Sequence, residues 1–208
     1  MTNLNRSTAD ILKDAEETLK TAEHGLKDLI EGHPEKRLSG LRNLVVFGRA
    51  VTNVLQNLRS TEPAFDKWYG RYKEEMQNDP LLKYFYNLRS EILKKGVLDV
   101  STRTSIQKLE LPKDLLKFGP PPPNAISFFV GDNRGGLGWV VQLPDGSEEK
   151  YYISMPSDMG SVTLHFPDSP KFHLGKDLKG NSIDTLSRIY IEYLRQLVDS
   201  AKHTFQHK

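Results

Sequence analysis

The first 96 residues carry four successive apolar stripes at helical spacing, and this feature limits the fold more than any other. The first stripe lies in residues 9–31 and ends at the Gly-His-Pro break of residues 32–34, and the second follows in residues 35–59. Apolar residues three and four positions apart fall on one side of an α-helix. Such sides have to be buried, so the pattern predicts long amphipathic helices that pack against each other.

The third and fourth stripes are preceded by clear helix-start signals. Ser60 or Thr61 is the expected cap of the third helix, whose aromatic stripe is typical of core packing. Asp79 is the expected cap of the fourth helix, which has proline in its first position and ends at Gly96. The short connections favour antiparallel neighbours and therefore an up-and-down bundle.

The second half of the chain has a different character. Strand-like segments, separated by turn residues, lie at residues 125–130, 138–143, 150–154 and 162–166. They predict an antiparallel meander of three or four strands. A last amphipathic helix at residues 183–203 needs a partner and must pack on the sheet or on the bundle. The expected class is α+β, mainly α.

This pattern divides the chain into three parts. Residues 1–96 are expected to form the four-helix bundle. Residues 97–124 are expected to be a linker, since they contain a run of four prolines. Residues 125–208 are expected to hold the β-meander and the last helix, packed on the bundle.

Composition excludes several classes of protein. The chain has no cysteine, which removes disulfides, thiolate zinc sites, iron–sulfur clusters and cysteine nucleophiles. No cluster of metal-ligand residues stands out, so neither a metal nor a cofactor is expected. The N-terminus lacks the apolar core of a signal peptide, and no apolar run is long enough to span a membrane. We therefore expect a cytoplasmic protein with no membrane partner.

Charge is balanced overall, at a net +2, but it alternates along the helical half. Residues 33–60 hold five basic and one acidic side chain, and residues 80–96 hold four and one, whereas the first and third helices are acidic. In one interpretation, adjacent helices attract each other across the bundle. In the other, the second and fourth helices share a basic surface for a phosphate-bearing ligand.

Arg89 occupies an unexpected place in the fourth helix. On a helical wheel it lies in the middle of the arc formed by the apolar residues. A guanidinium cannot lose its charge, so burying it is costly unless carboxylates, carbonyls or a ligand satisfy it. Either an internal carboxylate clamps Arg89, or this part of the helix faces a groove or a subunit interface.

The second helix carries a polar line on the side opposite its apolar arc. The line consists of Arg42, Arg49, Asn53 and Gln56. Any solvated helix shows such a face, and a phosphate-reading surface would show it too. In the second interpretation the candidate binding residues are Arg42, Asn43, Arg49, Asn53 and Tyr86.

The segment Leu88-Arg89-Ser90-Glu91-Ile92-Leu93-Lys94-Lys95-Gly96 resembles the signature of HEPN domains. That signature is an arginine followed by a polar residue, with a histidine a few positions later. Here Lys94 stands at the histidine position. The resemblance covers the helical half and implies an antiparallel bundle that often dimerises, which brings two motifs together in a cleft. Many such domains are metal-independent ribonucleases of toxin–antitoxin and antiviral systems, and others have lost catalysis.

Three hypotheses follow. The first is a non-catalytic or altered HEPN-like binding or regulatory protein, in a defence or toxin–antitoxin system, that forms a homodimer. The second is a metal-independent ribonuclease that uses Arg89, Glu91 and Lys94. The third is a helical scaffold whose β segment binds a protein. RNA, a nucleotide or a protein is the expected partner.

Overall fold

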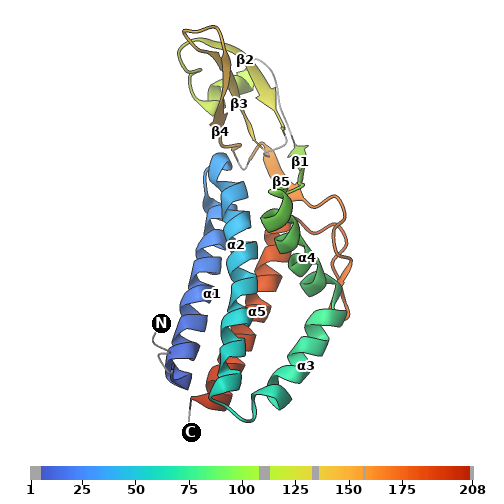
Figure 1. Ribbon diagram of the computed structural model, residues 1–208. Coiled ribbons are helices and arrows are strands. Elements are labelled where there is room, and N and C mark those ends of the chain that lie inside the picture. The colour runs from blue at the N-terminus through green and yellow to red at the C-terminus, as the bar shows by residue number, and fades with distance from the viewer. Residues whose placement is uncertain (1–5, 108–112, 133–135, 157, 207–208) are drawn as a thin grey trace.

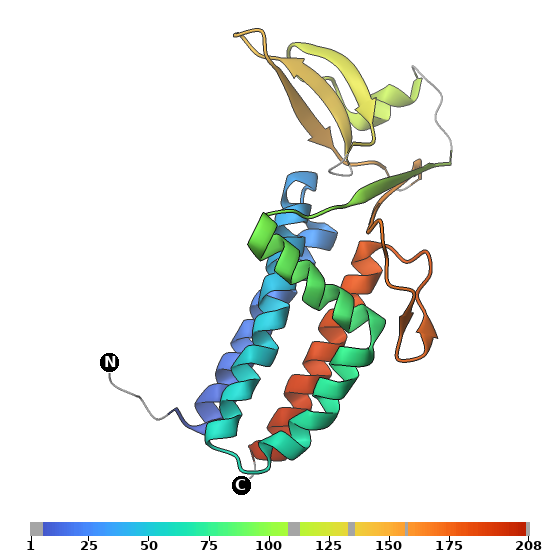
Figure 2. The same ribbon diagram turned by 45° about the vertical axis from the view of Figure 1, so that its right-hand side comes forward.

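The computed structural model describes residues 6–107, 113–132, 136–156 and 158–206, and five helices form its main body (Figure 1). The helices are α1 (Thr8–Glu31), α2 (Pro34–Leu55), α3 (Phe65–Asn78), α4 (Pro80–Lys95) and α5 (Ile183–Phe205). Long helices α1 and α2 form an antiparallel hairpin, and α5 runs beside them (Figures 1 and 2). Helices α3 and α4 form a bent pair on the other side of α5 from α1.

Local signals in the sequence set the ends of α1 and α4. The Ser7 side chain and Asp10 form a reciprocal capping box at the start of α1. Asp79 caps α4 by accepting a hydrogen bond from the amide of Leu82. Gly96 ends α4 in the left-handed conformation, at φ 68°, which glycine adopts without strain. Helix α2 ends four residues earlier than the predicted Arg59, because a 3-10 turn, η1 (Gln56–Ser60), replaces its last turn. The predicted cap of the third helix, Ser60 or Thr61, is wrong, because η1 occupies this stretch and α3 begins after Ala64 without a side-chain cap.

Helices α1 and α2 are in backbone contact where two glycines face each other. A Cβ atom on Gly25 would lie 2.7 Å from the carbonyl oxygen of Gly40, and one on Gly40 would lie 2.7 Å from the carbonyl oxygen of Gly25. Any side chain at either position would push the helices apart. The glycines therefore allow the close approach of the hairpin.

Most of the β structure extends beyond one end of the bundle, and a short hairpin at residues 172–177 lies beside the helices (Figures 1 and 2). It contains β1 (Ser101–Ile106), β2 (Ala125–Val130), β3 (Leu137–Gln142), β4 (Glu148–Ile153), β5 (Gly160–His165), the short strands β6 (Phe172–His173) and β7 (Lys176–Asp177), and the 3-10 turn η2 (Lys113–Phe118). Strands β2, β3 and β4 form an antiparallel meander in that order. Strand β5 pairs with β1, and β6 with β7.

The α+β class is confirmed, with mainly helical structure, a small antiparallel meander and a C-terminal helix. The meander has three strands rather than four. The fourth candidate, β5, pairs with β1 and does not join the meander. The last helix was expected to pack either on the sheet or on the bundle. It packs mainly on the bundle, because the apolar face of α5 lies in the bundle core. The stretch 97–124, expected as a linker, contains β1 and η2. The turn residues between the predicted strands at 125–130 and 138–143 lie partly outside the described residues.

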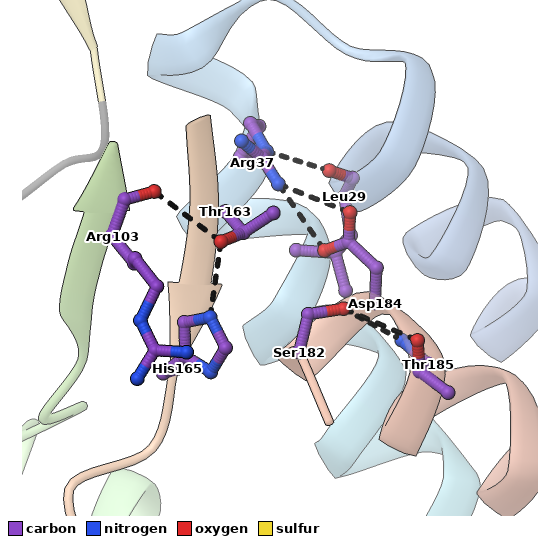
Figure 3. Close-up of polar contacts among 8 residues, drawn as sticks. All are labelled: Leu29, Arg37, Arg103, Thr163, His165, Ser182, Asp184 and Thr185. Atoms are coloured by element: carbon purple, nitrogen blue, oxygen red, sulfur yellow. Dashed lines mark hydrogen bonds and ion pairs between the residues drawn. The ribbon is translucent and has the colours of Figure 1, made fainter. Parts of the chain in front are cut away.

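Arg37 forms a polar joint between three helices of the bundle, next to the β1–β5 ribbon (Figure 3). The buried side chain of Arg37 donates from Nε to the carbonyl oxygen of Leu29 at 2.8 Å and from Nη2 to both carboxylate oxygens of Asp184 at 3.2 Å. It therefore ties the end of α1 and the start of α5 to α2. On the neighbouring β5, the Thr163 hydroxyl contacts the carbonyl oxygen of Arg103 and the ring of His165 (Figure 3).

Within the described ranges, no helix combines the length and the apolar character that crossing a membrane requires.

Candidate functional site

A cavity of about 390 Å³ opens between α2 on one side and α3 and α4 on the other, and residues of α5 close its base. This volume lies within the range of small-molecule sites. The lining residues are Arg49, Thr52, Gln56, Arg59, Tyr69, Lys73, Met76, Gln77, Leu82, Lys83, Tyr86, Asn87, Tyr190, Tyr193 and Leu194. Five separate segments of the chain therefore contribute to one site.

The floor of the cavity consists of its buried lining residues. These are Thr52, Tyr69, Leu82, Tyr190, Tyr193 and Leu194. The ring of Tyr190 stacks on Phe85, with centroids 4.2 Å apart and planes 2° apart. Its other neighbour is Gly48 of α2, where a Cβ atom would lie 2.7 Å from Cε1 of Tyr190. Tyr190 is thus held in place from two helices.

The rim of the cavity is basic. Arg49 of α2, Arg59 of η1, Lys73 of α3 and Lys83 of α4 line it, and no carboxylate is among the described lining residues. Arg59 is partly neutralised, because its Nε lies 2.8 Å from a carboxylate oxygen of Asp66. Four cations on one concave surface raise the local positive potential and favour an anionic ligand.

Arg49 is positioned by neutral groups. Its guanidinium donates to the hydroxyl of Thr52, and its Cζ lies 5.2 Å from the centroid of the Tyr86 ring. The Thr52 hydroxyl in turn donates to the carbonyl oxygen of Arg49 at 2.9 Å. Within the described part of the chain, no carboxylate forms an ion pair with Arg49, so its charge remains available to a ligand.

The tyrosines of the floor stay protonated near neutral pH. Burial raises the pKa of Tyr69 and of Tyr190. Burial, and after it the nearby carboxylate of Glu75, raises the pKa of Tyr193. The Tyr193 hydroxyl is buried and has no hydrogen-bond partner among the residues that the structure describes. Because this oxygen is itself buried, the cavity is lined by other atoms of Tyr193.

A buried carboxylate supports the cavity from the α3–α4 turn. Asp79 accepts hydrogen bonds from the ring of His173 at 3.0 Å and from the amides of Leu82 at 3.0 Å and Leu174 at 2.8 Å. Burial alone would raise the pKa of Asp79, but these three hydrogen bonds together outweigh it and hold the pKa below its usual value. The His173 ring lies 6.1 Å edge-on from Tyr193. Asp79 thereby fastens the β6–β7 hairpin beside the cavity.

Two of the five predicted binding residues line the cavity, namely Arg49 and Tyr86. Arg42 does not line the cavity. Its guanidinium donates a hydrogen bond to the carbonyl oxygen of Gly96, directly after α4, at 2.9 Å. Asn43 and Asn53 are exposed and do not line the cavity.

The three predicted catalytic residues lie outside the cavity lining. Arg89 is half-buried, and its Nε is buried without a hydrogen-bond partner among the described residues. Of the two explanations considered for Arg89, the carboxylate clamp is not found among the described residues. Glu91 is exposed and forms an ion pair with Lys95 at 2.7 Å, and Lys94 is exposed as well.

Sequence reasoning missed several residues of the cavity. The aromatic stripe of the third helix was interpreted as core packing, which is right for Phe65 and Trp68. Tyr69 and Met76 of the same stripe also line the cavity. Tyr190 and Tyr193 come from the C-terminal helix, and no local signal linked that helix to α2 or α4.

The fold and the cavity define a helical bundle with a β-rich extension and a basic, tyrosine-lined site of ligand size. Residues 26–128 match the family model described as bacteriophage lambda protein ea47. The matched stretch includes α2, η1, α3 and α4, which supply the four cations of the rim, but not α5. No curated protein and no solved structure matches the chain.

Proposed function

We propose that this protein is a non-catalytic binding or regulatory module whose cavity holds a phosphate-bearing ligand of the nucleotide class, free or as part of an RNA. The observation that carries the proposal is the rim of four cations, without a carboxylate among the described lining residues, above a floor of tyrosines. Arg and Lys are the side chains that bind phosphate through charge-assisted hydrogen bonds. Tyrosine rings are surfaces on which proteins stack bases, and among the lining tyrosines Tyr86 has the exposed ring, at 52%.

The chemistry of the lining supports binding rather than catalysis. General acid–base catalysis near neutral pH needs a group that titrates there, and histidine serves best. No histidine is among the described lining residues, and the buried tyrosines have raised pKa values. The ammonium groups of Lys73 and Lys83 are suited to holding a bound anion.

The HEPN-like resemblance remains part of this proposal. It leads us to expect a homodimer in which Arg89, with its unpartnered Nε, lies near the subunit interface. The match of residues 26–128 to a bacteriophage family supports a phage-related setting. The defence or toxin–antitoxin context that we propose rests on the HEPN-like resemblance alone. Sedimentation velocity on the purified chain tests the dimer.

A second candidate function is protein binding by the β segment. It is favoured by large apolar side chains that the β-rich end leaves in solvent, since Leu116 is 83%, Tyr151 55% and Ile126 51% exposed. Replacing Leu116 and Ile126 by serine would abolish binding to a protein partner in this case. The same change would leave nucleotide binding intact.

Calorimetric titration of nucleoside monophosphates and of a short single-stranded RNA tests the main proposal. We expect binding that weakens as salt concentration rises, and that weakens further in the double variant Lys73→Ala/Lys83→Ala. An RNA-cleavage assay with EDTA, run with the wild type and Arg89→Ala, distinguishes the ribonuclease alternative. Cleavage that is lost in the variant would replace our proposal by that alternative, whereas absence of binding to every probe would refute it.

A further inference from the structure

Two pairs of exposed side chains in the cavity repeat the same chemistry. Lys73 and Gln77 lie four residues apart on α3, and Lys83 and Asn87 lie four residues apart on α4. Side chains at this spacing are neighbours on one face of a helix. All four are exposed, and their side chains form no hydrogen bond or ion pair with another described residue. Each pair therefore offers a ligand a cation and an amide, which both donates and accepts hydrogen bonds.

An arginine from the opposite wall of the cavity accompanies each pair. Arg59 of η1 lies beside α3, since its Nε is 2.8 Å from a carboxylate oxygen of Asp66. Arg49 of α2 lies beside α4, with its Cζ 5.2 Å from the centroid of the Tyr86 ring. The cavity thus contains two subsites, each with an arginine, a lysine and an amide. The α3 subsite consists of Arg59, Lys73 and Gln77, and the α4 subsite of Arg49, Lys83 and Asn87.

The two subsites are too far apart to share one phosphate group. Arg49 and Arg59 are ten residues apart, which corresponds to about 15 Å or more along α2 and η1. Lys73 lies about 9 Å along α3 before the turn at Asp79, and Lys83 about 6 Å along α4 after it. Helix α4 continues away from α3 beyond this turn (Figure 2). A single phosphate therefore occupies one subsite and leaves the other empty.

The charge of the rim also favours two phosphate groups. The four cations, reduced by the Asp66 carboxylate that pairs with Arg59, leave three formal positive charges. A nucleoside monophosphate carries about 1.5 to 2 negative charges near neutral pH, and each linking phosphodiester adds about one. A 5′-phosphorylated dinucleotide therefore matches the charge of the rim, whereas a mononucleotide leaves part of it uncompensated.

We propose that the ligand is a 5′-phosphorylated dinucleotide with one nucleotide at each subsite, either free or as the 5′ end of a single-stranded RNA. This inference rests on the proposed function and names the ligand of that site. In each subsite the arginine and the lysine bind a phosphate, and the amide of Gln77 or Asn87 contacts the edge of a base. Asp66 competes with the ligand for Arg59. The α4 subsite is therefore the stronger one and holds a mononucleotide.

The experiment is a calorimetric titration of the full chain with 5′-phosphorylated homo-oligoribonucleotides of one, two and three residues, in each of the four bases. For at least one base we expect the dinucleotide to bind about tenfold or more tightly than the mononucleotide. The trinucleotide should gain less than about twofold further, because both subsites are already filled. A longer RNA with the same 5′ end distinguishes the two sources, since it binds like the dinucleotide only if the site accepts the end of a strand.

A lysine substitution in each subsite tests the assignment. Lys73→Ala should weaken the dinucleotide by about tenfold and leave the mononucleotide unchanged, because the mononucleotide occupies the α4 subsite. Lys83→Ala should weaken both ligands. Lys67→Ala is the matched control, since Lys67 is an exposed lysine of α3 that does not line the cavity. It should bind both ligands like the wild type.

The outcomes separate the two proposals. Equal affinities for the mononucleotide and the dinucleotide, or equal losses in Lys73→Ala and Lys67→Ala, would overturn the two subsites while the phosphate site stands. A constant gain with each added nucleotide would also overturn them, since it would indicate a groove that follows a longer strand. No binding of any probe would overturn both proposals.

Discussion

The guanidinium of Arg49 lies over the ring of Tyr86, with Cζ 5.2 Å from the ring centroid, so that α2 meets α4 at the mouth of the basic cavity. A cation over an aromatic face is stabilised by the ring's negative potential. Arg49 is therefore held toward the cavity without a carboxylate that would neutralise it.

This contact predicts different effects for two changes of Tyr86. Tyr86→Phe keeps the ring and should preserve both stability and ligand binding. Tyr86→Ala should lower the free energy of unfolding by about 0.5–1 kcal/mol and weaken binding of a nucleoside monophosphate. Urea denaturation and calorimetry measure the two effects. If both variants lose binding equally, the Tyr86 hydroxyl rather than its ring is what matters.

Gly48 should be intolerant of any side chain. A Cβ atom there would lie 2.7 Å from Cε1 of Tyr190, so Gly48→Ala must displace the ring that stacks on Phe85. We expect a loss of about 1–3 kcal/mol and weaker ligand binding. Gly70 of α3 is the matched control, because a Cβ atom there meets nothing within 4 Å. Gly70→Ala should stabilise the protein by about 0.5–1 kcal/mol through helix propensity, and a stabilised Gly48→Ala would contradict this account.

The Asp79 carboxylate should make stability depend on pH. Because its folded-state pKa lies below the ordinary value of 3.8, its contribution is present above that pH and is lost as the pH falls through the folded-state pKa. Asp79→Asn should cost about 1–3 kcal/mol at pH 7, and the difference from the wild type should shrink below about pH 4. Urea denaturation between pH 7 and pH 3 measures it. Asp199→Asn, on an exposed site of α5, should show no comparable difference at any pH.

The joint formed by Arg37 should contribute more to the free energy of unfolding than a surface ion pair does. Its side chain is 11% exposed and satisfies both the Leu29 carbonyl and Asp184. Arg37→Ala leaves these groups without their partner and should cost about 2–4 kcal/mol. Arg195 pairs with Glu23 and Glu192 but is 46% exposed, so Arg195→Ala should cost less than about 1 kcal/mol. Similar losses in the two variants would show that the Arg37 joint contributes no more than surface charge.

The helices of the first half could be predicted because their signals are local. Asp79 and Gly96 mark the two ends of α4 by short-range capping, which depends on the residues next to them. The pairing of β5 with β1 could not be predicted, since it joins segments about sixty residues apart and competes with the meander. Secondary structure followed from neighbouring residues, whereas strand partners depended on the whole fold.

Only some residues of the cavity could be predicted from the sequence. Arg49 and Tyr86 were identified from charge and helix position, and both line the cavity. Tyr193 was missed because its contribution depends on the packing of α5 against helices more than a hundred residues earlier. Arg42 was included because it shares a helix face with Arg49, but its partner, the carbonyl oxygen of Gly96, becomes visible only in three dimensions.

The most direct test of the central claim compares Arg49→Ala with Arg42→Ala in a calorimetric titration with nucleoside monophosphates. The two arginines lie two turns apart on α2, but only Arg49 lines the cavity. Our account predicts binding by the wild type, a loss of about tenfold or more in affinity for Arg49→Ala, and wild-type affinity for Arg42→Ala. Equal affinities in all three proteins, or an equal loss in both variants, would contradict the assignment of this cavity as the ligand site.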